Sequence, residues 1–131
     1  MIPDFATRQR NLRLLMDKKR IDAIFTSDPA NIHYYIGYEG MRDDRMFMLL
    51  PRHGEPTLFV SILGNEAVKK YEKTVFYTST KEIIKRIKHF KKLGYNEKKM
   101  NVFLFNKLDK LKIKMVPVGE MMELPRKIKD D

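Results

Sequence analysis

The 131-residue sequence predicts a three-layer α/β domain, with a mixed sheet of five to six strands and helices on both faces of the sheet. Two observations lead to this prediction. Short apolar runs alternate along the chain with stretches of helical spacing, which is typical of α/β domains. Two apolar runs, 45–50 and 56–61, are separated only by the turn-forming segment 51–55, and they predict an antiparallel hairpin. Because of this hairpin, the sheet is expected to be mixed rather than purely parallel.

The first third of the chain predicts a helix, a buried strand and a second, short helix. Asp4 is a favourable helix cap, and apolar residues follow it at helical spacing as far as residue 20. The run 21–26 is apolar or small at five of its six positions, as expected of a central strand that is covered on both faces. Asp28 is a second cap, and Pro29 suits the first position of the helix that follows it. Gly37 is expected to end that helix.

The remaining elements are predicted from helix caps and strand-like runs. Ser79 and Glu82 have the spacing of a capping box and begin an amphipathic helix, which Gly94 is expected to end. Pro117 marks the last strand as an edge strand, because proline cannot donate a hydrogen bond to a neighbouring strand. Pro125 is expected to break the last helix. After the hairpin, the predicted elements are a helix over 65–73, a strand over 74–78, a helix over 79–94, a strand over 100–105, a helix over 106–111, a strand over 112–118 and a helix over 120–129.

Composition restricts the class of protein. Hydrophobic residues make up 43% of the chain, which fits one globular domain. The sequence has no signal-peptide pattern and no apolar run near the roughly 20 residues of a membrane span, so we expect no membrane insertion. The absence of cysteine excludes disulfides and thiolate metal sites and is typical of a cytoplasmic protein. Abundant lysine and glutamate with a single glutamine also fit a thermophilic source.

Positive charge is concentrated in one part of the chain. The formal net charge is +10, and the segment 69–114 holds 15 Lys and Arg against 4 acidic residues, a balance of +11. The lysines have helix-surface spacing and no interleaved aromatic pair, which favours solvated helix faces over a nucleic-acid site. A module that binds nucleic acid or another protein through the basic face 69–114 is the alternative hypothesis.

No residue pattern predicts catalysis by this chain. Its three histidines are scattered and lack the carboxylate spacing of a metal site, so we expect no metal site. They are His33, His53 and His89. Asp43 and Asp44 are neighbours in a polar loop, where Arg42 and Arg45 are the expected partners of a solvated cluster. The sequence also contains neither a glycine-rich phosphate loop nor a G-x-S-x-G nucleophile elbow.

The segment after the first strand resembles a known family signature. Asp28-Pro29-Ala30-Asn31-Ile32, followed by Tyr34 and by Gly37-Tyr38, is similar to the motif DPANIxYLTGF. That motif belongs to the N-terminal domain of the creatinase/prolidase (Xaa-Pro peptidase) family. The segment 54–60, G-E-P-T-L-F-V, resembles the hairpin of the same domain, and 124–131 resembles its connection to a catalytic domain. The signature residues in this chain are Asp28, Pro29, Asn31, Tyr34, Gly37 and Tyr38.

The resemblance implies a creatinase/prolidase N-terminal fold over residues 1–124 and the start of a linker to a C-terminal catalytic domain over 125–131. In the family, that second domain holds divalent metal ions (Mn, Co or Zn) with two aspartates, one histidine and two glutamates, a pattern that this chain does not match. The chain alone is therefore expected to be inactive and to need no cofactor. The full-length protein would be a metal-dependent Xaa-Pro dipeptidase or aminopeptidase, and a creatinase-like enzyme that is not a peptidase is a further alternative.

The resemblance also implies a role at the active site of a partner subunit. In the family, this domain helps to build a homodimer and directs a loop toward the partner's active site, which limits access to short proline-containing peptides. The corresponding loop here is 39–46, and its candidate substrate contacts are Arg42, Asp43 and Arg45. A guanidinium group can hold a peptide carboxylate through paired N–H donors. The expected partners are thus a second copy, the catalytic domain of the same chain and short Xaa-Pro peptides, with nucleic acid not expected.

Overall fold

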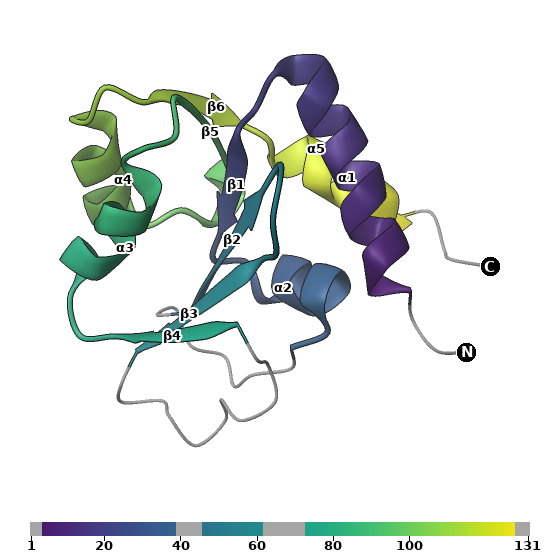
Figure 1. The fold of residues 1–131 in the computed structure, drawn as a ribbon, viewed down its shortest axis with the longest axis horizontal. Coiled ribbons are helices and arrows are strands. Elements are labelled where there is room, and N and C mark those ends of the chain that lie inside the picture. The colour runs from purple at the N-terminus through teal and green to yellow at the C-terminus, as the bar shows by residue number, and fades with distance from the viewer. Residues whose placement is uncertain (1–3, 39–45, 62–72, 128–131) are drawn as a thin grey trace.

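The computed structural model describes residues 4–38, 46–61 and 73–127, and it contains a six-stranded sheet between two layers of helices (Figure 1). The strand order is β4-β3-β2-β1-β5-β6. β1 pairs with β2 in the antiparallel sense and with β5 in the parallel sense, so the prediction of a mixed sheet is confirmed. The strands are β1 (Ala23–Thr26), β2 (Phe47–Pro51), β3 (Thr57–Ser61), β4 (Thr74–Tyr77), β5 (Lys92–Tyr95) and β6 (Lys114–Pro117).

Helices cover both faces of the sheet, as predicted. On one face lie α1 (Phe5–Lys19), α2 (Pro29–Ile36) and α5 (Gly119–Lys127), and on the other lie α3 (Thr80–Ile87) and α4 (Val102–Asp109) (Figure 1). A short 3-10 helix, η2 (Glu97–Lys99), follows β5. Each face therefore has its own hydrophobic core, and the two cores meet only through the sheet.

β1 is the central strand, and its residues alternate between the two cores. All four of them are buried. Ile24 packs with the core under α1, α2 and α5, whereas Phe25 packs with the core under α3 and α4. Phe25 stacks on Phe47 of the neighbouring strand, with 5.2 Å between the ring centroids. The predicted burial of this strand on both faces is confirmed.

The prediction of a strand over 100–105 is wrong, because this segment begins a helix. Asn101 caps α4, with its side-chain oxygen 3.1 Å from the backbone nitrogen of Leu104. Leu104 is buried, but Val102 and Phe103 are 71% and 62% exposed. Their β-branched and aromatic character favours a strand when it is considered alone, although the helix spacing of the buried residues decides the outcome.

The strand that the sequence missed is β5, which lies where the predicted helix over 79–94 was expected to end. α3 ends earlier, at Ile87. Gly94 is a residue of β5 rather than a helix stop, and a Cβ added to it would lie 3.0 Å from the side chain of Val118 and 3.1 Å from that of Ile24. Glycine at this position lets the side chains of both neighbours pack against the strand.

The other predicted elements agree with the structure apart from their boundaries. The hairpin is β2–β3, and β6 lies at the edge of the sheet with Pro117 as its last residue. α5 continues through Pro125 as far as Lys127, so the predicted break does not occur. The predicted helix over 65–73 lies almost entirely outside the described residues.

We predict that Phe25→Ala lowers the free energy of unfolding by about 3–5 kcal/mol, the usual cost of removing a fully buried aromatic side chain. Urea denaturation followed by circular dichroism measures the change. Phe103→Ala is the matched control, because the same atoms are removed from an exposed site and the expected change is within about 0.5 kcal/mol. Equal effects of the two substitutions would contradict the central position of β1.

Candidate functional site

The signature segment lies at the carboxyl end of β1, where the chain turns into α2. Asp28 has an extended backbone, and its Oδ1 accepts a hydrogen bond from the backbone N–H of Ala30 at 3.0 Å. Pro29 occupies the first helical position, where a missing N–H costs nothing. Gly37 ends the helix with a φ of 74°, and its N–H donates to the carbonyl of His33 at 2.9 Å. The predicted caps at both ends of this helix are thus confirmed.

Asn31 is a fully buried polar residue that joins three segments. Its Oδ1 accepts hydrogen bonds from the hydroxyl of Thr26 at 3.1 Å and from the Nδ2 of Asn96 at 2.8 Å. Asn96 is also fully buried, and its Oδ1 accepts from the backbone N–H of Lys98 at 3.1 Å. α2 is therefore attached to the end of β1 and to the start of η2 by side-chain amides in the protein interior, where such bonds are costly to break.

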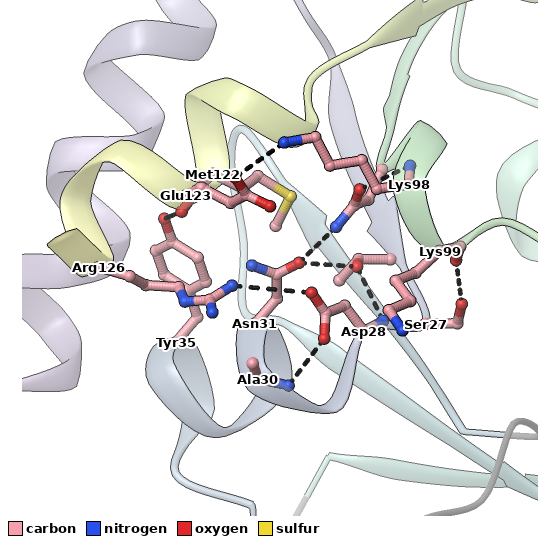
Figure 2. Close-up of polar contacts among 12 residues, drawn as sticks. Ser27, Asp28, Ala30, Asn31, Tyr35, Lys98, Lys99, Met122, Glu123 and Arg126 are labelled. Carbon is pink, nitrogen blue, oxygen red and sulfur yellow. Dashed lines mark hydrogen bonds and ion pairs between the residues drawn. The ribbon is translucent and has the colours of Figure 1, made fainter.

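Two tyrosines of the signature helix hold α5. The hydroxyl of Tyr34 donates to the carbonyl of Pro125, and the hydroxyl of Tyr35 donates to the carbonyl of Met122, each at 3.1 Å. These carbonyls lie in the last turns of α5, where helix carbonyls lack partners or are only partly satisfied within the helix. Figure 2 shows Tyr35 and Arg126 on the side of α2 that faces α5.

Charged side chains add to the same interface. The guanidinium of Arg126 lies 3.7 Å from Oδ2 of Asp28, so Asp28 caps α2 and also faces α5 (Figure 2). Lys98 of η2 forms an ion pair with Glu123 at 2.9 Å, and this hydrogen bond raises the pKa of the Lys98 ammonium. Glu97 accepts a hydrogen bond at 2.7 Å from the N–H of Gly119, the first residue of α5. A carboxylate at this end of a helix compensates unpaired N–H groups.

α1 closes the other end of α2. Arg8 donates to the carbonyl of Tyr34, and Gln9 donates to the carbonyl of Tyr35, each at 2.9 Å. The guanidinium of Arg8 also lies 4.1 Å from the ring centroid of Tyr34. A Cβ added to Gly37 would lie 2.6 Å from the ring of Phe5, so glycine is needed here both for its φ and for space. The last turn of α2 is thus held by side chains of α1.

The described contacts of the signature residues therefore form a structural junction. Asp28, Asn31 and Tyr34 bind α5 or η2, Pro29 and Gly37 shape the helix, and Tyr38 is buried in the core between the sheet and α1, α2 and α5. We refer to these contacts between α2, η2 and α5 as the α2–α5 junction. Sequence reasoning did not identify the partner residues Asn96, Glu97 and Glu123. The one local signal is the pair Asn-Glu directly after β5, where Asn96 caps η2.

The candidate substrate contacts Arg42, Asp43 and Arg45 lie outside the described residues. Their flanks are described: Tyr38 and Met46 are both buried. Within residues 4–38, 46–61 and 73–127, no three histidine, aspartate or glutamate side chains are grouped closely enough to hold a metal ion. The resemblance assigns the divalent metal of the family to a C-terminal catalytic domain, and the described residues offer no ligand set of their own for it. No helix in that part has both the length and the apolar character that crossing a bilayer requires.

The α2–α5 junction predicts different outcomes for two substitutions of Asp28. Asparagine is as good a helix cap as aspartate, so Asp28→Asn should remove only the charge that faces Arg126 and cost about 0–1 kcal/mol. Asp28→Ala removes the cap as well and should cost about 0.5–2 kcal/mol more. Denaturant midpoints of the two variants separate the cap from the ion pair. Equal losses in the two variants would contradict a contribution of the cap and would mean that the charge, which both substitutions remove, accounts for the effect.

Tyr35 predicts a pH dependence of stability. Burial raises the pKa of its hydroxyl well above the usual value of about 10 for tyrosine, and the neighbouring Tyr34 adds to the shift. Because the folded pKa is higher than the unfolded one, the stabilising contribution is complete below pH 10 and is lost as the pH rises from there toward the folded pKa. Tyr35→Phe should cost about 0.5–1.5 kcal/mol at pH 8, for the lost hydrogen bond to Met122.

The matched comparison for Tyr35 is made at pH 11. Between pH 8 and pH 11, the free energy of unfolding should fall by roughly 1 kcal/mol more in the wild type than in Tyr35→Phe. The reason is that only the wild type has this hydroxyl, which ionises on unfolding. Urea denaturation of both proteins at the two pH values gives the difference, and all other alkaline effects cancel. An identical pH dependence of the two proteins would contradict the burial of the Tyr35 hydroxyl.

Known proteins resemble this chain in sequence over most of its length. A family profile described as the creatinase/prolidase N-terminal domain matches residues 8–128. A curated relative, an uncharacterised peptidase of Staphylococcus epidermidis, is 31% identical over 65 residues, which cover 49% of this chain and 18% of the relative. The chain thus spans a small part of the length of that relative.

Solved structures share the fold. A prolidase from Pyrococcus horikoshii has a TM-score of 0.81 and 22% identity, with 95% of this chain and 36% of that chain covered. A prolidase from Thermococcus sibiricus has a TM-score of 0.82 and 20% identity, with 99% and 39% covered. The N-terminal domain of an Xaa-Pro dipeptidase from Streptococcus pyogenes has a TM-score of 0.71 and 20% identity, with 92% and 98% covered. Together with the profile match over residues 8–128, the six-stranded mixed sheet and its signature helix show that this chain belongs to the creatinase/prolidase N-terminal domain family.

Proposed function

We propose that this chain is the non-catalytic N-terminal domain of a metal-dependent Xaa-Pro dipeptidase, where it contributes to a homodimer and limits which peptides reach the partner's active site. The observation that carries the proposal is the family match over residues 8–128, which includes the signature helix and α5. Peptidase and prolidase relatives support the reaction class. Hydrolysis and its divalent metal are assigned to a catalytic domain elsewhere in a longer protein.

The described residues support a positioning role. α2 is held by α1 at its carboxyl end and by η2 and α5 along its length, through side-chain hydrogen bonds. The segment 39–45 begins after buried Tyr38 and ends before buried Met46. The two flanking residues are therefore fixed in the core, which supports a proposal that places peptide selection between them.

The proposal includes the partners and the location of the protein. The partners are a second copy of the chain, a catalytic domain of the same protein and short proline-containing peptides. The lack of cysteine supports a cytoplasmic location. Nucleic-acid binding through the basic face 69–114 is not part of the proposal, since no contact within the described residues favours it.

The gating role predicts kinetic effects of Arg42 and Arg45. In the full-length protein, Arg42→Ala or Arg45→Ala should lower kcat/KM for an Xaa-Pro dipeptide. The decrease should correspond to a loss of about 1.5–3 kcal/mol in transition-state stabilisation, the range for a hydrogen bond to a charged group. The melting temperature should change little, because the proposal gives these arginines a role in substrate binding and none in the core. Steady-state kinetics with added Mn²⁺ and thermal denaturation are the two measurements.

Arg10→Ala is the matched control for these variants. Arg10 is an exposed arginine of α1 whose guanidinium hydrogen-bonds Thr7, and its replacement should leave kcat/KM unchanged. Wild-type kinetics in both loop variants would overturn the gating role but not the family assignment. A full-length protein that hydrolyses no Xaa-Pro peptide would instead overturn the dipeptidase assignment.

A further inference from the structure

A groove lies on the face of the sheet that α3 and α4 cover, opposite to the α2–α5 junction. α3 is only eight residues long and ends at Ile87, and the groove extends from its polar side to the β2–β3 turn. Its volume is about 760 Å³, within the range of roughly 300–1,000 Å³ that small-molecule sites occupy. Apolar, basic and histidine side chains line the groove, together with one carboxylate.

The groove has an apolar part and a basic part. Leu49, Val75 and Phe90 supply aliphatic and aromatic surface, and all three also pack against the core beneath α3 and α4. Lys85 and Arg86 project from the last turn of α3. A largely apolar cleft with a few charged groups at one side is the usual form of a site that orients an amphipathic small molecule.

The charged lining residues of the groove are two cations, Lys85 and Arg86, and one carboxylate, so the groove has a formal net charge of +1. That carboxylate, Glu82, is directed to Thr78 rather than to either cation: Oε2 accepts from the backbone N–H at 3.1 Å and Oε1 accepts from the hydroxyl at 3.0 Å. Neither Lys85 nor Arg86 forms an ion pair with any residue in the described part of the chain. Two adjacent cations with free donors are therefore exposed beside an apolar surface.

Two imidazoles complete the polar side. His53 lies in the β2–β3 turn and His89 follows α3, so the two imidazoles come to the groove from different parts of the chain. The ring of His89 packs against that of Phe90, with 4.2 Å between the centroids. Each imidazole can donate a ring N–H to an anion, in addition to the donors of Lys85 and Arg86.

We propose that this groove binds a small organic anion, in which a carboxylate, sulfonate or phosphate group is attached to an apolar body. The anionic group accepts charge-assisted hydrogen bonds from Lys85 and Arg86. The apolar body is buried against Leu49, Val75 and Phe90, which removes it from water. The site is separate from the proposed peptidase function, because it lies across the sheet from the helices that make the α2–α5 junction.

The first experiment uses 1-anilinonaphthalene-8-sulfonate, a fluorescent sulfonate with an aromatic body, titrated into the folded 131-residue chain at pH 7. We expect one saturable site. N-Phenyl-1-naphthylamine, which has the same rings without the sulfonate, should bind at least tenfold more weakly. Equal binding of the two probes would overturn the role of the cations, because an apolar surface alone would then account for the affinity.

A pair of double variants tests the residues. Lys85→Gln with Arg86→Gln should weaken sulfonate binding by at least tenfold. Lys110→Gln with Lys112→Gln removes the same charge from exposed positions outside the groove and should change the affinity less than threefold. Circular dichroism verifies that both variants are folded. Equal losses in the two variants would overturn the proposal, since they would reflect the net charge of the protein rather than this groove.

Competition identifies the head group, and nuclear magnetic resonance locates the site. Phenylacetate and phenyl phosphate are added separately to displace the probe, and the more effective of the two identifies carboxylate or phosphate as the preferred anion. Inorganic phosphate should be much weaker, and equal displacement by it would overturn the need for an apolar body. Backbone amide shifts caused by the probe should be largest at residues 53–57, 75 and 85–90. Shifts centred on α1, α2 or α5 would overturn the assignment of the site to this groove.

Discussion

The complete enclosure of β1 is the constraint on which the other contacts depend. This strand has a neighbour on each edge and a helix layer on each face, so its backbone groups and its side chains are all satisfied within the protein. A strand of four residues cannot be moved in such surroundings without disturbing both cores. The end of β1 is therefore a fixed point, and α2 begins three residues after it. Thr26, the last residue of the strand, hydrogen-bonds both Asn31 and the backbone N–H of Asp28.

From this fixed point, the signature residues distribute their contacts in three directions. Asn31 reaches η2, the tyrosines reach α5, and the carbonyls at the end of α2 are bound by α1. In a short isolated helix, the same side-chain and carbonyl groups would form hydrogen bonds with water instead. An eight-residue helix is not stable on its own, so its order comes from these tertiary partners rather than from its intrinsic propensity. The hydrogen bonds of the motif thus fix the position of α2 relative to η2, α5 and α1.

Short sequence patterns predicted the caps, turns and strand positions that depend only on neighbouring residues. The caps at Asp28 and Gly37, the hairpin and the edge position marked by Pro117 could each be read from a few adjacent residues. The segment 100–105 could not, because Val102 and Phe103 have the residue types of a strand and their exposure depends on the packing of Leu104 and Leu108. β5 was missed for a related reason: Gly94 looks like a helix stop until Ile24 and Val118 are known to lie beside it.

The candidate site was predictable in its residues but not in its contacts. The resemblance identified Asn31 and Tyr34, yet their partners Asn96 and Pro125 are 65 and 91 positions away in the sequence. No spacing rule relates residues so far apart, and a single sequence contains no record of which pairs meet. The groove beside α3 was not predicted either. One of its histidines lies in a turn, and the other follows a helix that was predicted to extend seven residues too far.

The proline inside α5 affects how the last turn of this helix is held. Pro125 cannot donate to the carbonyl of Met121, so the last turn of α5 lacks one of its own hydrogen bonds. It is held instead by hydroxyl groups of α2, at Met122 and at Pro125 itself. The order of the last turn of α5 therefore depends on the side chains of Tyr34 and Tyr35. Through these two tyrosines, a helix that contains proline takes its order from a neighbouring helix rather than from its own backbone.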